Sequence, residues 1–186
     1  VLAAHGRIDG LVNNAGGQFP SPLEKISAKG WDAVVRNNLT GGFLMAREAY
    51  NQWMARHGGA IVNIIADIWM GMPSMGHSGA ARGGMLTLTE TAACEWAASG
   101  VRVNAVAPGL TLPTEDYRPA QMVALEAMMP LERLPEPDQI ADAVAWLANA
   151  EAVTGQTIYV DGGASLKSFE RDFVYLGSAG TPPSQT

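Results

Sequence analysis

The stretch Val101-Arg-Val-Asn-Ala-Val-Ala-Pro-Gly109 contains a short, apolar and β-branched segment that ends in a Pro-Gly turn. The segment Val101–Val106 is the right length for a strand and too apolar to leave one face in water. It therefore predicts a parallel strand that is covered on both sides. Three further segments have the same character and complete a predicted sheet of four strands: Ile8–Val12, Ala60–Ile65 and Thr157–Val160.

Long helical segments alternate with these strands, and they are expected at about Ser27–Arg56, Gly79–Ala98 and Pro137–Ala148. This alternation is typical of an α/β fold, here a doubly wound parallel sheet with flanking helices. Gly58 and Gly100 follow the first two helices, where glycine favours helix ends, and Asp138 is expected to cap the third. One domain is predicted over residues 1–167, with a loose extension over residues 168–186.

The composition limits the classes of function. The chain has 186 residues, of which 47% are apolar and 16% are charged, and its formal net charge is −6. This composition supports a packed core, and no apolar run approaches the roughly 18 residues of a membrane span. The negative charge gives no bulk attraction for nucleic acid or an anionic membrane surface, so neither partner is expected.

Cysteine and histidine usage adds two expectations. The single Cys94 cannot form an internal disulfide, which fits a reducing compartment, and a cytoplasmic location is expected. His5 and His57 lie at expected helix ends, and their spacing suggests no metal site.

Five motifs, in order, resemble those of the short-chain dehydrogenase/reductase family. They are Asn13-Asn-Ala-Gly16, Asn38-Leu-Thr-Gly41, Arg102–Gly109, Thr154-Gly-Gln156 and Val160-Asp-Gly-Gly163. The resemblance covers about residues 2–166 and implies a Rossmann-type fold, present here as a partial version with four strands. It also implies a nicotinamide cofactor, expected to be NADP(H).

Two features depart from the family pattern. Family members begin with a strand, a Gly-rich turn and a helix that hold the cofactor pyrophosphate, and this sequence has no such glycine motif. Because Val1–His5 also look like the end of a helix, we expect the chain to be a fragment of a larger parent. The family's Tyr-x-x-x-Lys falls on Ser78 and Arg82, and its usual serine falls on Ile65–Ala66. Ordinary carbonyl reduction through a tyrosine is therefore not expected.

The variant motif His77-Ser-Gly-Ala-Ala-Arg82 resembles one branch of the family, the peroxisomal trans-2-enoyl-CoA reductases and their bacterial relatives. This resemblance implies NADPH-dependent reduction of the α,β double bond of an acyl-CoA thioester, as in fatty acid metabolism. Two alternatives stay open. The chain can be a reductase of the same fold acting on an alcohol, aldehyde or 3-oxoacyl substrate, or a catalytically silent oligomerisation fragment.

The resemblance implies a role for each candidate catalytic residue. Ser78 would donate to the thioester oxygen, and Asn38 would hold a water or donate as well. Arg82 would bind the nicotinamide ribose in place of lysine, and Asp67 would act as an acid just past the second strand. Each residue also has a structural interpretation, as a helix brace, a helix terminus, a surface ion pair or a loop cap. His77 is expected to pack or cap more than to react.

The remaining expectations concern ligands and partners. The cofactor-binding residues implied by the family are Asn14, Ala15, Gly16, Arg82, Pro108, Gly109 and Thr111, with Thr114 as the alternative to Thr111. The apolar loop Trp69–Met75 either lines an acyl pocket or packs on a neighbour. The segment Pro113–Pro130 is expected to form a lid with a short helix at Ala120–Met129. The family that the sequence resembles builds its dimer or tetramer with the two long helices, so the resemblance implies a homo-oligomer.

Overall fold

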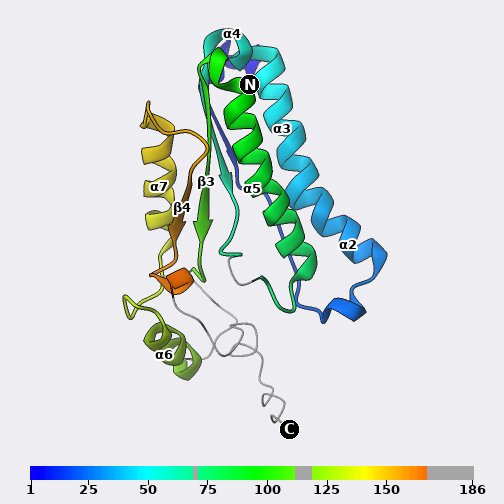
Figure 1. Ribbon diagram of the computed structural model, residues 1–186, viewed down its shortest axis with the longest axis vertical. Helices are drawn as coiled ribbons and strands as arrows, with labels where there is room; N and C mark the ends of the chain where they lie inside the picture. The colour runs from blue at the N-terminus through cyan, green and yellow to red at the C-terminus, as the bar shows by residue number, and fades with distance from the viewer. Residues whose placement is uncertain (69–70, 112–118, 167–186) are drawn as a thin grey trace.

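The strands form one parallel sheet in the order β1-β2-β3-β4 (Figure 1). The computed structural model describes residues 1–68, 71–111 and 119–166. Within these ranges the predicted α/β fold is confirmed, and every predicted strand overlaps an observed one. The observed bounds are β1 Gly10–Asn13, β2 Gly59–Ile64, β3 Val101–Pro108 and β4 Thr157–Val160.

Helices cover both faces of the sheet, as expected for a doubly wound arrangement (Figure 1). On one face, α3 (Gly41–Ala49) and α5 (Gly76–Trp96) pack on β1 and β3, around a core that includes Ile61. On the other face, α7 (Pro137–Asn149) packs on β2, β3 and β4 through the fully buried Leu147. The central strands β2 and β3 are therefore shielded on both sides, as predicted, whereas Val12 on the edge strand β1 is 49% exposed, so the expectation of full cover is wrong for β1.

The first long helix is not a single α-helix. After the N-cap Ser27, the helical path runs through α2 Ala28–Val35, a π-helical turn Arg36–Thr40, α3, a second π-helical turn Tyr50–Met54, and α4 Ala55–His57. The prediction of one helix over Ser27–Arg56 is correct in extent and misses both π turns. A π turn changes the angular position of the residues that follow. Asn38 and Met54 lie in these turns and are buried.

The glycine-rich start of α5 permits close packing. The helix begins at Gly76 and not at the expected Gly79. A Cβ on Gly76 would lie 2.6 Å from Leu23 Cδ1, and a Cβ on Gly84 would lie 2.9 Å from Leu39 Cδ2. The absence of side chains at these two glycines thus lets the Leu23 and Leu39 side chains approach the helix.

Side chains of the Arg102–Gly109 motif anchor the C-terminal part of the sheet. Arg102 donates to the carbonyl oxygens of Leu147 and Ala148, at 2.7 and 2.6 Å, and so satisfies the end of α7. Asn104 donates to the Val153 carbonyl at 2.8 Å and accepts from the Gln156 amide at 3.0 Å. These residues of the motif are therefore structural in this chain.

The start of α7 corrects one sequence expectation. Its N-cap is Glu136, and Asp138 lies in the first helical turn. Pro137 occupies a position at the helix start where its missing N–H costs nothing, so the cap falls before it. The Gln139 side chain then accepts from the Glu136 backbone N–H at 3.1 Å.

The other helical elements are short. The expected helix end near the N-terminus is α1, which ends at His5 and is followed by Gly6 with φ 72°. The expected short helix at Ala120–Met129 is α6, shifted by one residue. These elements are α1 Leu2–His5, η1 Leu23–Lys25, η4 Ala97–Ser99, α6 Pro119–Met128 and η5 Ala164–Leu166. No helix among the described residues is long and apolar enough to cross a membrane. The predicted extension over 168–186 lies outside the described residues.

Replacing Arg102 tests the anchor between β3 and α7. Arg102→Ala removes two charge-assisted hydrogen bonds, so we expect the free energy of unfolding to fall by about 2 kcal/mol in urea denaturation. The control is Arg47→Ala, because Arg47 is exposed and its partners, the neighbouring Glu48 and the exposed Phe43 ring, lie on the surface, so its loss should cost less than about 1 kcal/mol. Equal effects of the two changes would contradict the anchoring role.

Candidate active site

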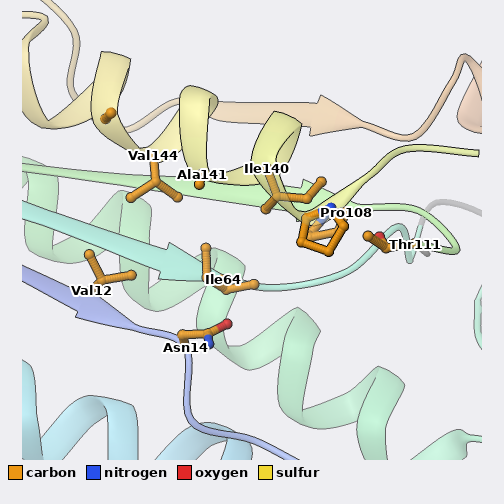
Figure 2. A pocket seen from close by; sticks show the side chains of 10 residues that line it. Val12, Asn14, Ile64, Pro108, Thr111, Ile140, Ala141 and Val144 are labelled. Atoms are coloured by element: carbon orange, nitrogen blue, oxygen red, sulfur yellow. The ribbon is translucent and has the colours of Figure 1, made fainter. Parts of the chain in front are cut away.

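The carboxyl ends of the strands meet at one edge of the sheet, where ligands bind in open α/β folds. A cavity of about 510 Å³ opens there (Figure 2). The ends of three strands supply Val12, Asn14, Ile64, Pro108 and Thr111, and the first turns of α7 supply Pro137, Ile140, Ala141, Val144 and Ala145. The structure therefore brings together three of the predicted cofactor-binding residues, Asn14, Pro108 and Thr111, in one cavity.

The loop after β1 is held by a two-way amide contact. Asn38 Nδ2 donates to the Gly17 carbonyl oxygen at 2.7 Å, and the Gly17 N–H donates to Asn38 Oδ1 at 3.0 Å. Asn38 is only 4% exposed. Both ends of its amide are therefore engaged with the loop backbone.

Gly16 lies between two predicted site residues. A Cβ at this position would lie 2.3 Å from Asn38 Oδ1 and 2.9 Å from Arg82 Nη2. Such distances leave no room for a side chain. Asn38 and Arg82, which are far apart in the sequence, thus meet at this glycine.

Arg82 is a largely buried cation on α5. Its Nη1 donates to the Ile64 carbonyl oxygen at 2.5 Å, and its Nε is buried with no hydrogen-bond partner in the described structure. Burial lowers the pKa of this guanidinium, although arginine stays protonated at physiological pH. An arginine with donors to spare beside the cavity-lining Ile64 fits a ligand that carries hydroxyl or phosphate oxygens.

Ser78 is turned toward the loop after β1. It is fully buried, and its hydroxyl donates to Gln18 Oε1 at 2.5 Å. Its backbone N–H donates to Nδ1 of the buried His77 at 2.8 Å. The His77 ring packs edge-on against Phe19, with 4.5 Å between ring centroids. His77 therefore packs against Phe19 and does not cap α5, whose N-cap is Met75, while the Ser78 proton is directed at Gln18.

Asp67 lies at the end of the next strand. Its backbone N–H donates to the Pro108 carbonyl oxygen at 3.1 Å, which joins the loops after β2 and β3. Asp67 and Asp161 also act on Tyr159, whose pKa is raised mainly by burial and further by these two carboxylates. Sequence reasoning missed Tyr159, because only the folded sheet brings β4 near the end of β2.

The turn after β4 supports the loop after β3. Asp161 is 5% exposed and accepts from the backbone N–H groups of Gly163 and Ser165, at 2.9 and 2.7 Å. A Cβ on Gly109 would lie 2.8 Å from the Asp161 Cβ. The close contact fixes the Pro108–Gly109 segment that lines the cavity edge.

Only some of the predicted residues in two loops lie within the described part of the chain. Thr111 lines the cavity, and its hydroxyl donates to the Gly109 carbonyl at 3.0 Å. The alternative Thr114 lies outside the described residues, as do Trp69 and Met70 of the apolar loop. Met72 of that loop packs on α5, where a Cβ on Gly79 would lie 3.2 Å from the Met72 Cβ. A role of the loop in acyl binding stays a prediction.

Comparison with known proteins identifies relatives along most of the chain. A family model described as enoyl-(acyl carrier protein) reductase matches residues 1–165. The chain is 37% identical over 175 residues to the peroxisomal 2,4-dienoyl-CoA reductase of Danio rerio. It is 38% identical over 178 residues to a probable 2,4-dienoyl-CoA reductase of Bacillus subtilis. These alignments cover 90% of this chain in both cases, and 58% and 70% of the relatives.

A solved structure is also similar. It is the citronellol catabolism dehydrogenase AtuB of Pseudomonas aeruginosa PAO1, with a TM-score of 0.77 and 52% sequence identity. The match covers 88% of this chain and 65% of that one. The chain thus spans somewhat more than half the length of the Danio rerio relative and about two thirds of the AtuB chain.

Gly16→Ala tests the close packing of the loop. The added methyl group would collide with Asn38 Oδ1, so we expect the amide contact to break and stability to fall by about 1–3 kcal/mol. Gly17→Ala is the matched control, because the nearest atom to a Cβ there is Asn37 Nδ2 at 3.8 Å. Urea denaturation of both variants measures the difference, and a Gly16 variant as stable as the Gly17 variant would count against the packing described.

Proposed function

The chain belongs to the short-chain dehydrogenase/reductase family of oxidoreductases, and on that premise we propose that it acts in the reduction of enoyl-CoA thioesters. The observation that carries the proposal is Ser78, which stands where the family has its tyrosine, is fully buried and donates its proton to Gln18. A buried hydroxyl engaged in this way is poorly placed to protonate a substrate carbonyl. The names of the Danio rerio and Bacillus subtilis relatives, both dienoyl-CoA reductases, support a CoA thioester as the substrate class.

The residues at the sheet edge fit a nicotinamide cofactor, for which NADPH is proposed. The half-buried Arg82 has a buried and unpartnered Nε within the described residues, and Gly16 is a position that only glycine can occupy beside it. The residues proposed to hold the cofactor are Asn14, Ala15, Gly16, Arg82, Pro108, Gly109 and Thr111. When bound, the cofactor supplies the hydride that the β-carbon of the substrate accepts.

Reduction of an enoyl thioester requires hydrogen-bond donors more than a strong acid. Negative charge develops on the thioester oxygen as the β-carbon accepts hydride, and donors aimed at that oxygen lower the barrier. The α-carbon then takes a proton from water or from a side chain. Asp67 is proposed for this proton transfer, because it lies at the same edge and is joined to the Pro108 loop. Asn38 and Ser78 hold the loop that faces the reaction.

A second candidate function follows from AtuB, which is 52% identical to this chain. Its name points to an alcohol or aldehyde of terpenoid type as an alternative substrate class. That reaction needs a proton donor for a carbonyl oxygen. Tyr159, at the carboxyl end of β4 with its raised pKa, is the phenol near this edge among the described residues.

A homo-oligomer is part of the proposal. Large apolar side chains on α3 are exposed, with Phe43 and Leu44 at 40% and Met45 at 57%. Such a surface is typical of a protein–protein contact. Covering α3 by a second copy would bury these side chains without closing the cavity at the sheet edge.

Turnover with a panel of substrates tests the function. We expect the chain to oxidise NADPH in the presence of crotonyl-CoA or a 2,4-dienoyl-CoA, and not with citronellal. Arg82→Met should lower kcat/KM at least tenfold through weaker cofactor binding, while Arg82→Lys should retain part of the activity. The control is Arg56→Met, on the exposed surface near the amino end of β2. Activity with citronellal alone would reject the thioester proposal in favour of the second candidate.

A further inference from the structure

The loop that follows β1 is held by two separate elements. Its first half is held by the π turn between α2 and α3, through the two-way contact between Asn38 and Gly17. Its second half is held by the start of α5 and by the turn that precedes this helix. There the Ser21 N–H donates to the Ser74 carbonyl oxygen at 2.8 Å. The two halves of the loop thus have independent anchors.

His77 is the buried part of the second anchor. It lies in the first turn of α5 and is 0% exposed, and its ring meets the Phe19 ring edge-on, with 4.5 Å between centroids. Aromatic pairs favour this arrangement beyond the area that they bury. On its other side the Phe19 ring approaches α2, where a Cβ on Gly30 would lie 2.9 Å from the Phe19 Cζ. The Phe19 ring is therefore held between the two helices, although the residue is 42% exposed.

The hydrogen bonds of the His77 ring define its tautomer and its orientation. Nδ1 accepts from the Ser78 backbone N–H at 2.8 Å, so the ring hydrogen lies on Nε2. This bond joins the ring to the backbone of α5 and fixes the side that meets Phe19. Nε2 is buried and has no hydrogen-bond partner in the described part of the chain.

The unpartnered Nε2–H indicates that stability alone does not account for a histidine at this position. A buried donor without a partner is a cost to the folded state, and a phenylalanine would fill a similar space without it. Local costs of this kind are expected chiefly at functional sites. The imidazole of His77 differs from a phenyl ring in the Nδ1 acceptor, and this acceptor sets the orientation of the ring against Phe19.

We propose that His77 is a positioning residue for the reaction, and that through its contact with Phe19 it fixes the second half of the loop after β1, independently of the Asn38 anchor. The assignment rests on the proposed function for the reaction that is measured. The first half of the loop adjoins the proposed cofactor residues Asn14 and Gly16 and has its own anchor. His77 therefore acts on turnover of the thioester and not on binding of the cofactor.

His77→Asn is the first test, because it removes the ring and keeps an oxygen acceptor for the Ser78 N–H. With crotonyl-CoA and NADPH we expect kcat/KM for the thioester to fall about tenfold, since a displaced loop impairs the geometry of the reacting groups. Calorimetric titration should give a Kd for NADPH within about twofold of the wild-type value, the scatter expected for independent sites. An equal change in this Kd and in kcat/KM would contradict the separate tasks of the two halves.

A double-mutant cycle shows whether His77 acts through Phe19. Phe19→Leu removes the aromatic partner, so the effect of His77→Asn on kcat/KM should largely disappear in that background. His77→Phe keeps a ring beside Phe19 and loses the acceptor, and it should cost less kcat/KM than His77→Asn. Independent effects of His77→Asn and Phe19→Leu, which multiply in the double variant, would overturn the proposal.

His57→Asn is the matched control, because His57 also packs on an aromatic ring. Its ring stacks on Trp53 with 3.7 Å between centroids, and its Nδ1 lies 2.9 Å from the Trp53 carbonyl oxygen. It ends α4 at the amino end of β2, whereas the loop after β1 lies at the carboxyl edge of the sheet. We expect this variant to keep the wild-type kcat/KM. A similar fall in the two asparagine variants would count against a positioning role for His77.

Hydrogen exchange followed by NMR reads the two anchors without any substrate. The Gly17 N–H, bonded to Asn38, reports on the first half of the loop, and the Ser21 N–H, bonded to Ser74, reports on the second. In His77→Asn we expect exchange at Ser21 to become at least about tenfold faster through local opening, with exchange at Gly17 unchanged. Unchanged exchange at Ser21, or faster exchange at both amides, would overturn the positioning role.

The positioning role and the proposed function fail in different ways. Wild-type turnover of crotonyl-CoA with an unchanged kcat/KM in His77→Asn would overturn the role of His77 and leave the function standing. If the wild type turns over no enoyl thioester, the proposed function fails. The exchange rates at Ser21 and Gly17 then decide alone whether His77 positions the loop.

Discussion

The two-way hydrogen bond between the Asn38 amide and the Gly17 backbone is the contact on which the site depends. It joins the helical layer to the end of β1 and sets the path of the loop that carries Gln18. It requires a π turn, which places Asn38 inward, and it requires Gly16, because any side chain there would occupy the position of the amide oxygen. The π turn, Gly16 and the Asn38 amide therefore depend on one another, because the contact needs all three.

Polar residues elsewhere in the sheet follow the same logic, because a buried polar group without a partner is costly. Asn13 donates to Asn63 Oδ1 at 2.8 Å, and Asn63 donates to the Thr89 hydroxyl at 2.8 Å, so that β1, β2 and α5 are linked through buried and half-buried polar atoms. Arg102 and Asn104 do the same between β3 and the segment around α7. Many polar residues of the sequence motifs that suggest a cofactor fold therefore serve to join the strands of the sheet to one another and to the neighbouring helices.

Features that depend on local sequence could be predicted, whereas features that depend on contacts between distant residues could not. The four strands follow from local apolar runs, and the helix ends follow from Gly58 and Gly100, whose positive φ angles are local properties. The two π turns could not be predicted, because one extra residue in a turn barely alters a helical pattern of apolar residues. The meeting of Asn38, Ser78 and Arg82 near Gly16–Gln18 was reached through family motifs. The contact between Ser78 and Gln18 was missed, because it joins residues sixty positions apart.

The size of the side chain at position 78 accounts for the chemistry proposed. A tyrosine carries its hydroxyl well beyond the helix surface, whereas the serine hydroxyl stays near the backbone, and here it is fully buried. A proton donor that acts on a substrate must reach it, and the Ser78 hydroxyl instead donates to Gln18. A site whose serine hydroxyl is engaged in this way offers no acidic proton at the position of the family's tyrosine. It therefore suits a reaction in which the oxygen only bears charge for a time and is a carbonyl again in the product, as in reduction of a conjugated thioester. An alcohol product, by contrast, needs a proton delivered to that oxygen, which the Gln18–Ser78 pair does not provide.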